Sequence, residues 1–114
     1  MRRGTLLTGL IIVLIIAFAV YEKTKPNDSN VSEELAKCIG ENSVLYSQVT
    51  CSHCVAQKRM FGENVKHLNI FECGSDNWKT CSEIGITGTP TWVINQRHYS
   101  GVRSVESIQQ LTGC

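Results

Sequence analysis

An unbroken apolar run opens the chain: Thr5–Tyr21 contains no charged residue and is rich in Leu, Ile and Val. Its 17 residues lie at the lower end of the roughly 17–25 that a membrane-spanning helix needs, and exceed the about 7–15 of a signal-peptide core. No side of the run is polar, which argues against a buried helix of a soluble domain. Ala17-Phe18-Ala19, however, has the small-x-small pattern that signal peptidase recognises. We expect an uncleaved membrane anchor, with a removed signal peptide as the alternative.

Residues 22–31 are rich in Lys, Pro, Asn, Asp and Ser and are typical of a flexible tether. Asn27 and Asn30 each begin an Asn-x-Ser sequence, which makes them candidate glycosylation sites, although so short a motif also occurs by chance. Arg2 and Arg3 should stay inside the cell, which places the rest of the chain on the extracytoplasmic side of a single-pass membrane protein, or in the medium after cleavage. We divide the chain into a signal anchor or signal peptide (1–21), a tether (22–31) and one folded domain (32–114).

Beyond the tether, helical and strand-like periods alternate. Ser32 is expected to cap a first helix that ends at Gly40 in the left-handed conformation. Runs of β-forming residues predict strands at 43–49, 66–72, 91–95 and 98–100, and amphipathic spacing predicts helices at 51–61, 78–84 and after Ser104. This order predicts an α/β domain, a mixed sheet with helices on both faces, preceded by one transmembrane helix.

Charge and cysteine content limit the classes of partner and site that the domain can have. Without residues 1–21 the chain keeps 9 Lys and Arg against 10 Asp and Glu and shows no basic stripe, so we expect no nucleic-acid partner. Six cysteines in so small an exported domain favour disulfides. A structural zinc site is the alternative, because four of the cysteines have a suitable spacing. These are Cys51, Cys54, Cys73 and Cys81. We expect no metal and no cofactor.

Cys51-Ser52-His53-Cys54 stands where a strand ends and a helix begins. Thiol exchange needs a thiolate, and a helix N-terminus lowers the pKa of a cysteine below its ordinary value of about 8.5. We therefore assign Cys51 as the attacking thiol and Cys54 as the resolving thiol, which together form the redox disulfide. A protonated His53 would add positive charge beside Cys51; the alternative is a solvated residue that tunes nothing.

Gly88-Thr89-Pro90-Thr91 opens a strand further along the chain. Together with the Cys-x-x-Cys sequence it resembles the thioredoxin family, in which a cis-proline faces the redox pair. The resemblance implies that Pro90 is cis and that the Thr89 backbone meets a bound peptide, with Ser52 also at the substrate site. An ordinary strand-opening proline is the alternative reading.

More closely, residues 35–114 resemble the thioredoxin-like domain that accompanies bacterial and archaeal homologues of vitamin K epoxide reductase. The matching residues span most of the domain: Cys51-x-His53-Cys54, Gln57-Lys58, Met60-Phe61-Gly62, Glu72-Cys73, Cys81, Gly85-Ile86 and Pro90-Thr91-Trp92. The resemblance implies electron exchange with a multi-helix membrane partner that is linked to quinone. With one apolar segment here, that partner is expected on a separate protein.

Three positions depart from these families. Thr50 stands where many members have an aromatic residue, and Ser52 where proline is common. Leu45 occupies the position of the buried acid of thioredoxins, which takes part in proton transfer to the resolving cysteine. The last departure slightly favours an oxidising role over a reducing one.

The other four cysteines are expected to pair by their place in this topology. Cys73 and Cys81 fall near the same sheet edge as Cys51 and should pin the loop between them, with a second redox pair as the alternative. Cys38 and Cys114 should lie near the opposite edge and pair there, with two free thiols as the alternative.

The sequence thus predicts a membrane-tethered thiol–disulfide oxidoreductase. Its expected partners are exported cysteine-containing proteins and a membrane quinone-linked oxidoreductase of the vitamin K epoxide reductase type. A redox-inert thioredoxin-fold module that binds or chaperones another protein is the alternative.

Overall fold

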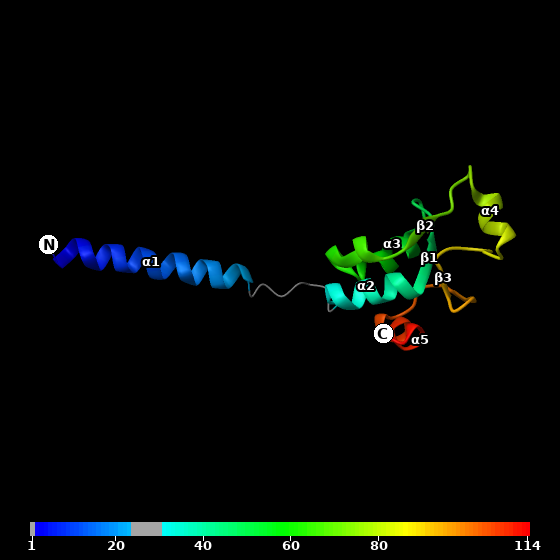
Figure 1. Cartoon of the computed structure of the whole chain (residues 1–114). Helices are drawn as coiled ribbons and strands as arrows, with labels where there is room; N and C mark the ends of the chain where they lie inside the picture. Colours follow the sequence, from blue (N-terminus) through cyan, green and yellow to red (C-terminus); the bar gives the residue numbers. More distant parts are fainter. Residues whose placement is uncertain (1, 24–30) are drawn as a thin grey trace.

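The computed structural model describes residues 2–23 and 31–114 (Figure 1). An N-terminal helix is followed by a domain of alternating helices and strands. In chain order the elements are α1 (Arg2–Lys23), α2 (Glu33–Asn42), β1 (Ser43–Ser47), α3 (Ser52–Arg59), the 3-10 helix η1 (Gly62–His67), β2 (Ile70–Glu72), α4 (Trp78–Glu83), β3 (Thr91–Ile94), β4 (Arg97–Ser100) and α5 (Val105–Thr112).

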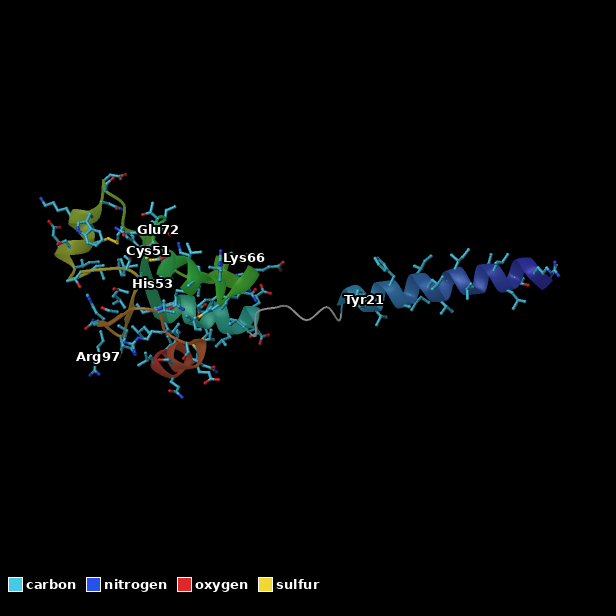
Figure 2. The ribbon with its side chains drawn as sticks, turned by 180° about the vertical axis from the view of Figure 1, so that it is seen from behind. Tyr21, Cys51, His53, Lys66, Glu72 and Arg97 are labelled. Atoms are coloured by element: carbon cyan, nitrogen blue, oxygen red, sulfur yellow. A yellow bond between two sulfur atoms is a disulfide. The ribbon has the colours of Figure 1, made fainter. Side chains whose placement is uncertain are left out.

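Helix α1 contains the apolar run. Its segment Arg3–Tyr21 has 19 residues and a mean hydropathy of 2.5, and none of it is buried inside the structure. Among the described residues it is the one helix long and apolar enough to cross a membrane, a test that a signal sequence also passes. Tyr21 stands near its C-terminal end (Figure 2). Asn27, Asn30 and most of the expected tether lie outside the described residues.

The four strands form one mixed sheet in the order β2-β1-β3-β4. Strands β1 and β2 run parallel, with Ser47 opposite Glu72. Strand β3 runs antiparallel to both β1 and β4, with Tyr46 opposite Thr91. The α/β class with a mixed sheet and flanking helices is therefore confirmed. Because β1 and β3 are antiparallel, the chain leaving β1 and the chain entering β3 meet at one sheet edge.

Alternation along the strands divides the core between two faces. Leu45, Trp92 and Ile94 join apolar residues of α2 and α5 in the main cluster on one face. Tyr46 and Val93 pack on the other face, against a smaller cluster that contains Cys73, Cys81 and Ile86. Figure 1 accordingly shows α4 well apart from α2 and α5. The sheet is thus covered on both sides, as the sequence pattern predicted.

The beginning of the domain differs in two details from the sequence prediction. Ser32 caps α2 as expected, its Oγ accepting from the Leu35 N–H at 3.1 Å. Gly40, however, does not end the helix, which continues to Asn42. A Cβ at Gly40 would collide with the His67 carbonyl oxygen, so this glycine allows α2 and η1 to approach each other closely. Val31, assigned to the tether, is only 2% exposed and belongs to the core.

The second expected strand is also shorter. Of residues 66–72, only Ile70–Glu72 pair in the sheet, and Gly62–His67 form the 3-10 helix. Leu68, in the expected strand, and Val65, just before it, pack on the main cluster without belonging to a strand. Their burial explains why the sequence here resembles a strand.

Candidate active site

Cys51 is the N-cap of helix α3. Its Sγ accepts a hydrogen bond from the backbone N–H of Cys54 at 3.3 Å, in the manner of the oxygen-bearing side chains that usually cap helices. Cys51 is half-buried, whereas Cys54 is 0% exposed. Both are free thiols, so the structure describes the reduced form of the expected pair. The difference in exposure suits an attacking Cys51 and a resolving Cys54.

The loop before β3 faces this helix start. The Thr89–Pro90 peptide bond is cis. The Cys51 thiol donates to the Thr89 carbonyl oxygen at 3.5 Å. The Thr89 hydroxyl donates to Gln48 Oε1 at 3.3 Å, which ties the loop before β3 to the loop after β1. The antiparallel pairing of β1 and β3 therefore brings together the two motifs singled out in the sequence.

Several hydrogen bonds favour the ionised form of Cys51. Partial burial acts to raise the pKa of its thiol, but hydrogen bonds with the Cys54 side chain and backbone N–H, the Thr89 side chain and the His53 backbone N–H outweigh this effect. The pKa of Cys51 is therefore lowered from its ordinary value. A lowered pKa increases the thiolate fraction at neutral pH and with it the nucleophilicity of this cysteine.

Ser52 and His53 are both exposed on the first turn of α3. Figure 2 shows His53 beside Cys51, at the same end of the domain as Glu72. His53 contributes to the Cys51 thiolate through its backbone N–H. The role predicted for its imidazole charge, and the contact of Ser52 with substrate, stay predictions.

A polar residue to which the sequence assigned no role lies one turn beyond Cys54. Gln57 is completely buried in α3 and hydrogen-bonds to Trp92, in β3, and to the Arg103 backbone. The sequence does contain one signal for Gln57: a large amide three residues after Cys54, and therefore on the same face of the predicted helix.

A second polar group lies between α3 and β2. Lys58 forms an ion pair with Glu72 Oε1. Glu72 Oε2 and the Oγ of its register partner Ser47 are buried and have no hydrogen-bond partner among the described residues. Leu45, at the position of the thioredoxin acid, is fully buried in the main cluster.

The structure joins Cys73 to Cys81, the pairing that the sequence predicted for them. Both are completely buried, with their Cα atoms 6.2 Å apart. A depression of about 400 Å³ lies between their loop and the loop before Cys51. Its lining residues are Gln48, Val49, Thr50, Glu72, Cys73, Gly74, Ser75 and Trp78. The four cysteines of the zinc alternative are not gathered into one cluster, and no group of three or more His, Cys, Asp or Glu side chains that could hold a metal ion occurs in residues 2–23 and 31–114.

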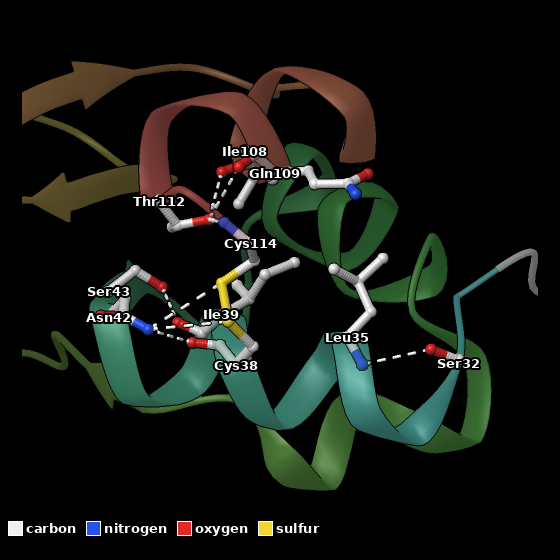
Figure 3. The surroundings of a disulfide bond; sticks show 10 residues. All are labelled: Ser32, Leu35, Cys38, Ile39, Asn42, Ser43, Ile108, Gln109, Thr112 and Cys114. Atoms are coloured by element: carbon white, nitrogen blue, oxygen red, sulfur yellow. Dashed lines mark hydrogen bonds between the residues drawn. A yellow bond between two sulfur atoms is a disulfide. The ribbon is translucent and has the colours of Figure 1, made fainter.

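Cys38 is joined to Cys114, again as predicted from the topology. This disulfide connects α2 to the end of α5, with Cα atoms 6.0 Å apart (Figure 3). Asn42 lies beside it, with Nδ2 at 3.7 Å and 3.8 Å from the two sulfur atoms. Cys38 precedes β1 and Cys51 follows it, so this disulfide and the candidate active site lie at opposite ends of the strand.

Comparison with known proteins agrees with this geometry. The thiol-disulfide oxidoreductase LTO1 of Arabidopsis thaliana is 35% identical to the chain over an alignment of 104 residues, which covers 82% of the chain. The chain thus resembles a thiol–disulfide oxidoreductase. It spans only 28% of the length of that relative. No protein-family model matches the chain.

Proposed function

We propose that this chain is a thioredoxin-fold thiol–disulfide oxidoreductase with Cys51 and Cys54 as its redox pair. The observation that carries the proposal is the position of the Cys51 sulfur at the start of α3, 3.3 Å from the Cys54 N–H and 3.5 Å from the Thr89 carbonyl oxygen. A nucleophilic thiol, a buried second thiol three residues away and a facing cis-proline loop are the parts that disulfide exchange requires.

The reaction needs only these groups and the substrate disulfide. The Cys51 thiolate attacks one substrate sulfur, the substrate S–S bond breaks, and the departing thiolate takes a proton from water. Cys54 then loses its proton and attacks the Cys51 sulfur of the mixed disulfide. This step forms the Cys51–Cys54 disulfide and releases the second substrate thiol, so two electrons pass from the protein to the substrate. The same steps in reverse oxidise a substrate dithiol. Thr89, Pro90 and Ser52 would line the substrate site.

The proposed setting is the extracytoplasmic face of a membrane, with α1 as the anchor. Support comes from the apolar character of α1 and from two disulfides in the domain. The substrates would be exported cysteine-containing proteins. Each turnover leaves the Cys51–Cys54 pair in the opposite redox state, so a second redox partner is required. We propose a membrane quinone-linked thiol oxidoreductase, a homologue of vitamin K epoxide reductase, for that role.

Equilibration of the full-length protein in mild detergent with glutathione redox buffers tests the activity. After acid quenching and alkylation, mass spectrometry should show Cys51 and Cys54 titrating together, with a potential between about −270 and −120 mV. Cys73–Cys81 should stay oxidised across that range, because a buried structural disulfide resists glutathione. Cys51→Ser and Cys54→Ser are the matched controls and should abolish the titration. A Cys51–Cys54 pair that does not cycle would support the redox-inert binding module instead.

A further inference from the structure

The side-chain amide of Gln57 is buried and fully hydrogen-bonded. Its Nε2 donates to the Arg103 carbonyl oxygen at 3.0 Å and to Met60 Sδ at 3.5 Å. Its Oε1 accepts from the Trp92 Nε1–H at 3.0 Å and from the Arg103 backbone N–H at 2.7 Å. Because an indole N–H and a backbone N–H only donate, they determine which end of the amide is the oxygen. All four hydrogen-bonding positions of this amide are thus used.

These bonds join three parts of the domain around the candidate active site. Gln57 lies three residues after Cys54, and the two are the buried residues of α3. Trp92 lies two residues after Pro90 in β3 and is itself 1% exposed. Arg103 belongs to the segment between β4 and α5. The amide therefore links the helix that carries the redox pair to the strand that begins at the cis-proline.

Burying an amide side chain is less favourable in free energy than burying an apolar one of the same size. Removing an amide from water costs free energy unless every polar atom finds a partner, and an apolar side chain of similar length would avoid that cost. What the amide adds is direction, because hydrogen bonds have preferred distances and angles: one bond joins α3 to Trp92 in β3, and two join it to the Arg103 backbone beyond β4.

The contact most sensitive to that placement is the one between Cys51 and Thr89. The hydrogen bonds from Cys54 and from the His53 backbone to Cys51 come from the first turn of α3 itself and move with the helix. On the β3 side, the Cys51 Sγ lies 3.5 Å from the Thr89 carbonyl oxygen, and the hydrogen bond with the Thr89 side chain, which lowers the pKa of Cys51, crosses from α3 to this loop. A small shift of α3 would break it and leave the others in place.

We propose that Gln57 is a positioning residue, whose amide holds α3 against β3 and thereby keeps Cys51 in contact with Thr89. This inference rests on the proposed function, since it concerns the reactivity of the same thiol. Gln57 does not touch the reacting atoms and acts through the helix that carries them.

The test uses the reduced full-length protein in mild detergent. Gln57→Met keeps the length of the side chain and removes all its hydrogen bonds, and Trp92→Phe removes one of them from the other end. The rate of Cys51 alkylation by iodoacetamide is followed from pH 5 to 9 by mass spectrometry. Below the pKa of an ordinary thiol, each variant should slow alkylation by about two- to fivefold. The double variant should be no slower than the slower single one, because both act on one contact.

Ile108→Val is the matched control, since Ile108 is completely buried in the main cluster and belongs to α5, which carries none of the candidate site residues. It should lower the thermal midpoint and leave the pH profile of alkylation unchanged. Gln57→Asn, one methylene shorter, is made in parallel as a milder variant in case Gln57→Met does not fold. Thr89→Ala should slow alkylation by itself and remove any further effect of the Gln57 substitution.

The proposal is wrong if folded Gln57 and Trp92 variants lose stability as the control does while their alkylation profiles overlay that of the wild type. That result would make Gln57 a packing residue only. If the Cys51–Cys54 pair of the wild-type protein does not cycle in redox buffers, the proposed function is wrong. The alkylation profile would still show whether Gln57 positions Cys51. The two failures are therefore distinguishable.

Discussion

Loss of the Cys38–Cys114 disulfide should strongly destabilise the domain. In the chain-entropy treatment, closing a loop of 76 residues stabilises a fold by about 4.5 kcal/mol at 25 °C, and closing the 8-residue loop of Cys73–Cys81 by about 2.5 kcal/mol. A domain of this size has a total free energy of unfolding of about 4–13 kcal/mol. The double variant Cys38→Ala/Cys114→Ala should therefore lose a third or more of that total.

Urea denaturation of the full-length protein in mild detergent, followed by far-ultraviolet circular dichroism, measures this loss. Asn42→Ala is the matched control, because Asn42 contacts both sulfur atoms and its removal leaves the disulfide intact. It should cost no more than about 1 kcal/mol. At low urea the double variant should keep the wild-type rate of Cys51 alkylation, since this disulfide and Cys51 lie at opposite ends of β1. A loss below about 2 kcal/mol, or a changed alkylation rate in folded protein, would refute the reasoning.

Five further predictions follow from the site and the fold. In the reduced protein, Cys51 should be alkylated before Cys54, because only Cys54 is completely buried. Since the folded pKa of Cys51 is lowered, the Cys51 thiolate should stabilise the reduced fold above the unfolded pKa, and this contribution should fade as pH falls through the folded value. The measurement is the urea midpoint of Cys54→Ser from pH 6 to 9, compared with that of the Cys51→Ser/Cys54→Ser double variant, which lacks this thiolate. His53→Ala should keep the Cys51 pKa lowered because the backbone N–H remains, and a return to the ordinary value in the alkylation profile would assign the effect to the imidazole charge. Gly40→Ala should lower stability by about 1–3 kcal/mol through the collision with His67, and an unchanged urea midpoint would contradict the close approach of α2 and η1. Cys54→Ala should trap a reductant-sensitive adduct that contains an integral membrane protein, whereas adducts with soluble exported proteins alone would leave that partner unsupported.

Much of this fold is encoded in local patterns. Ser32 and Ser104 cap their helices as predicted, because a hydroxyl just before an apolar helical period has a clear physical role there. The strand at Thr91 follows from β-branched and aromatic residues after a proline. The sequence assigns residues 66–68 to a strand, whereas residues 66 and 67 belong to the 3-10 helix, because short apolar stretches in a 3-10 helix and in a strand have similar compositions.

The role of Gly40 could not be predicted from the sequence, for a different reason. A glycine near the end of a helical period usually marks a left-handed end, and the sequence offered no sign that residue 67 would approach it. Only the packing of α2 on η1, set by residues more than 20 positions apart, gives Gly40 its role. A glycine needed for close approach and one needed for a positive φ look alike in sequence.

The residues of the candidate site also differ in how far the sequence alone reveals them. Cys51 and Cys54 were recognisable because their spacing is local, and Pro90 because a motif accompanies it. Gln57 was not, because its significance lies in Trp92 and Arg103, which are 35 and 46 residues away. What the sequence shows directly is the group that we propose to react, and what the fold adds is the set of contacts around it. The contact between Cys51 and Thr89 spans 38 residues and depends on the antiparallel pairing of β1 with β3. The reactivity that we propose for this thiol therefore depends on the sheet as much as on the Cys-x-x-Cys sequence.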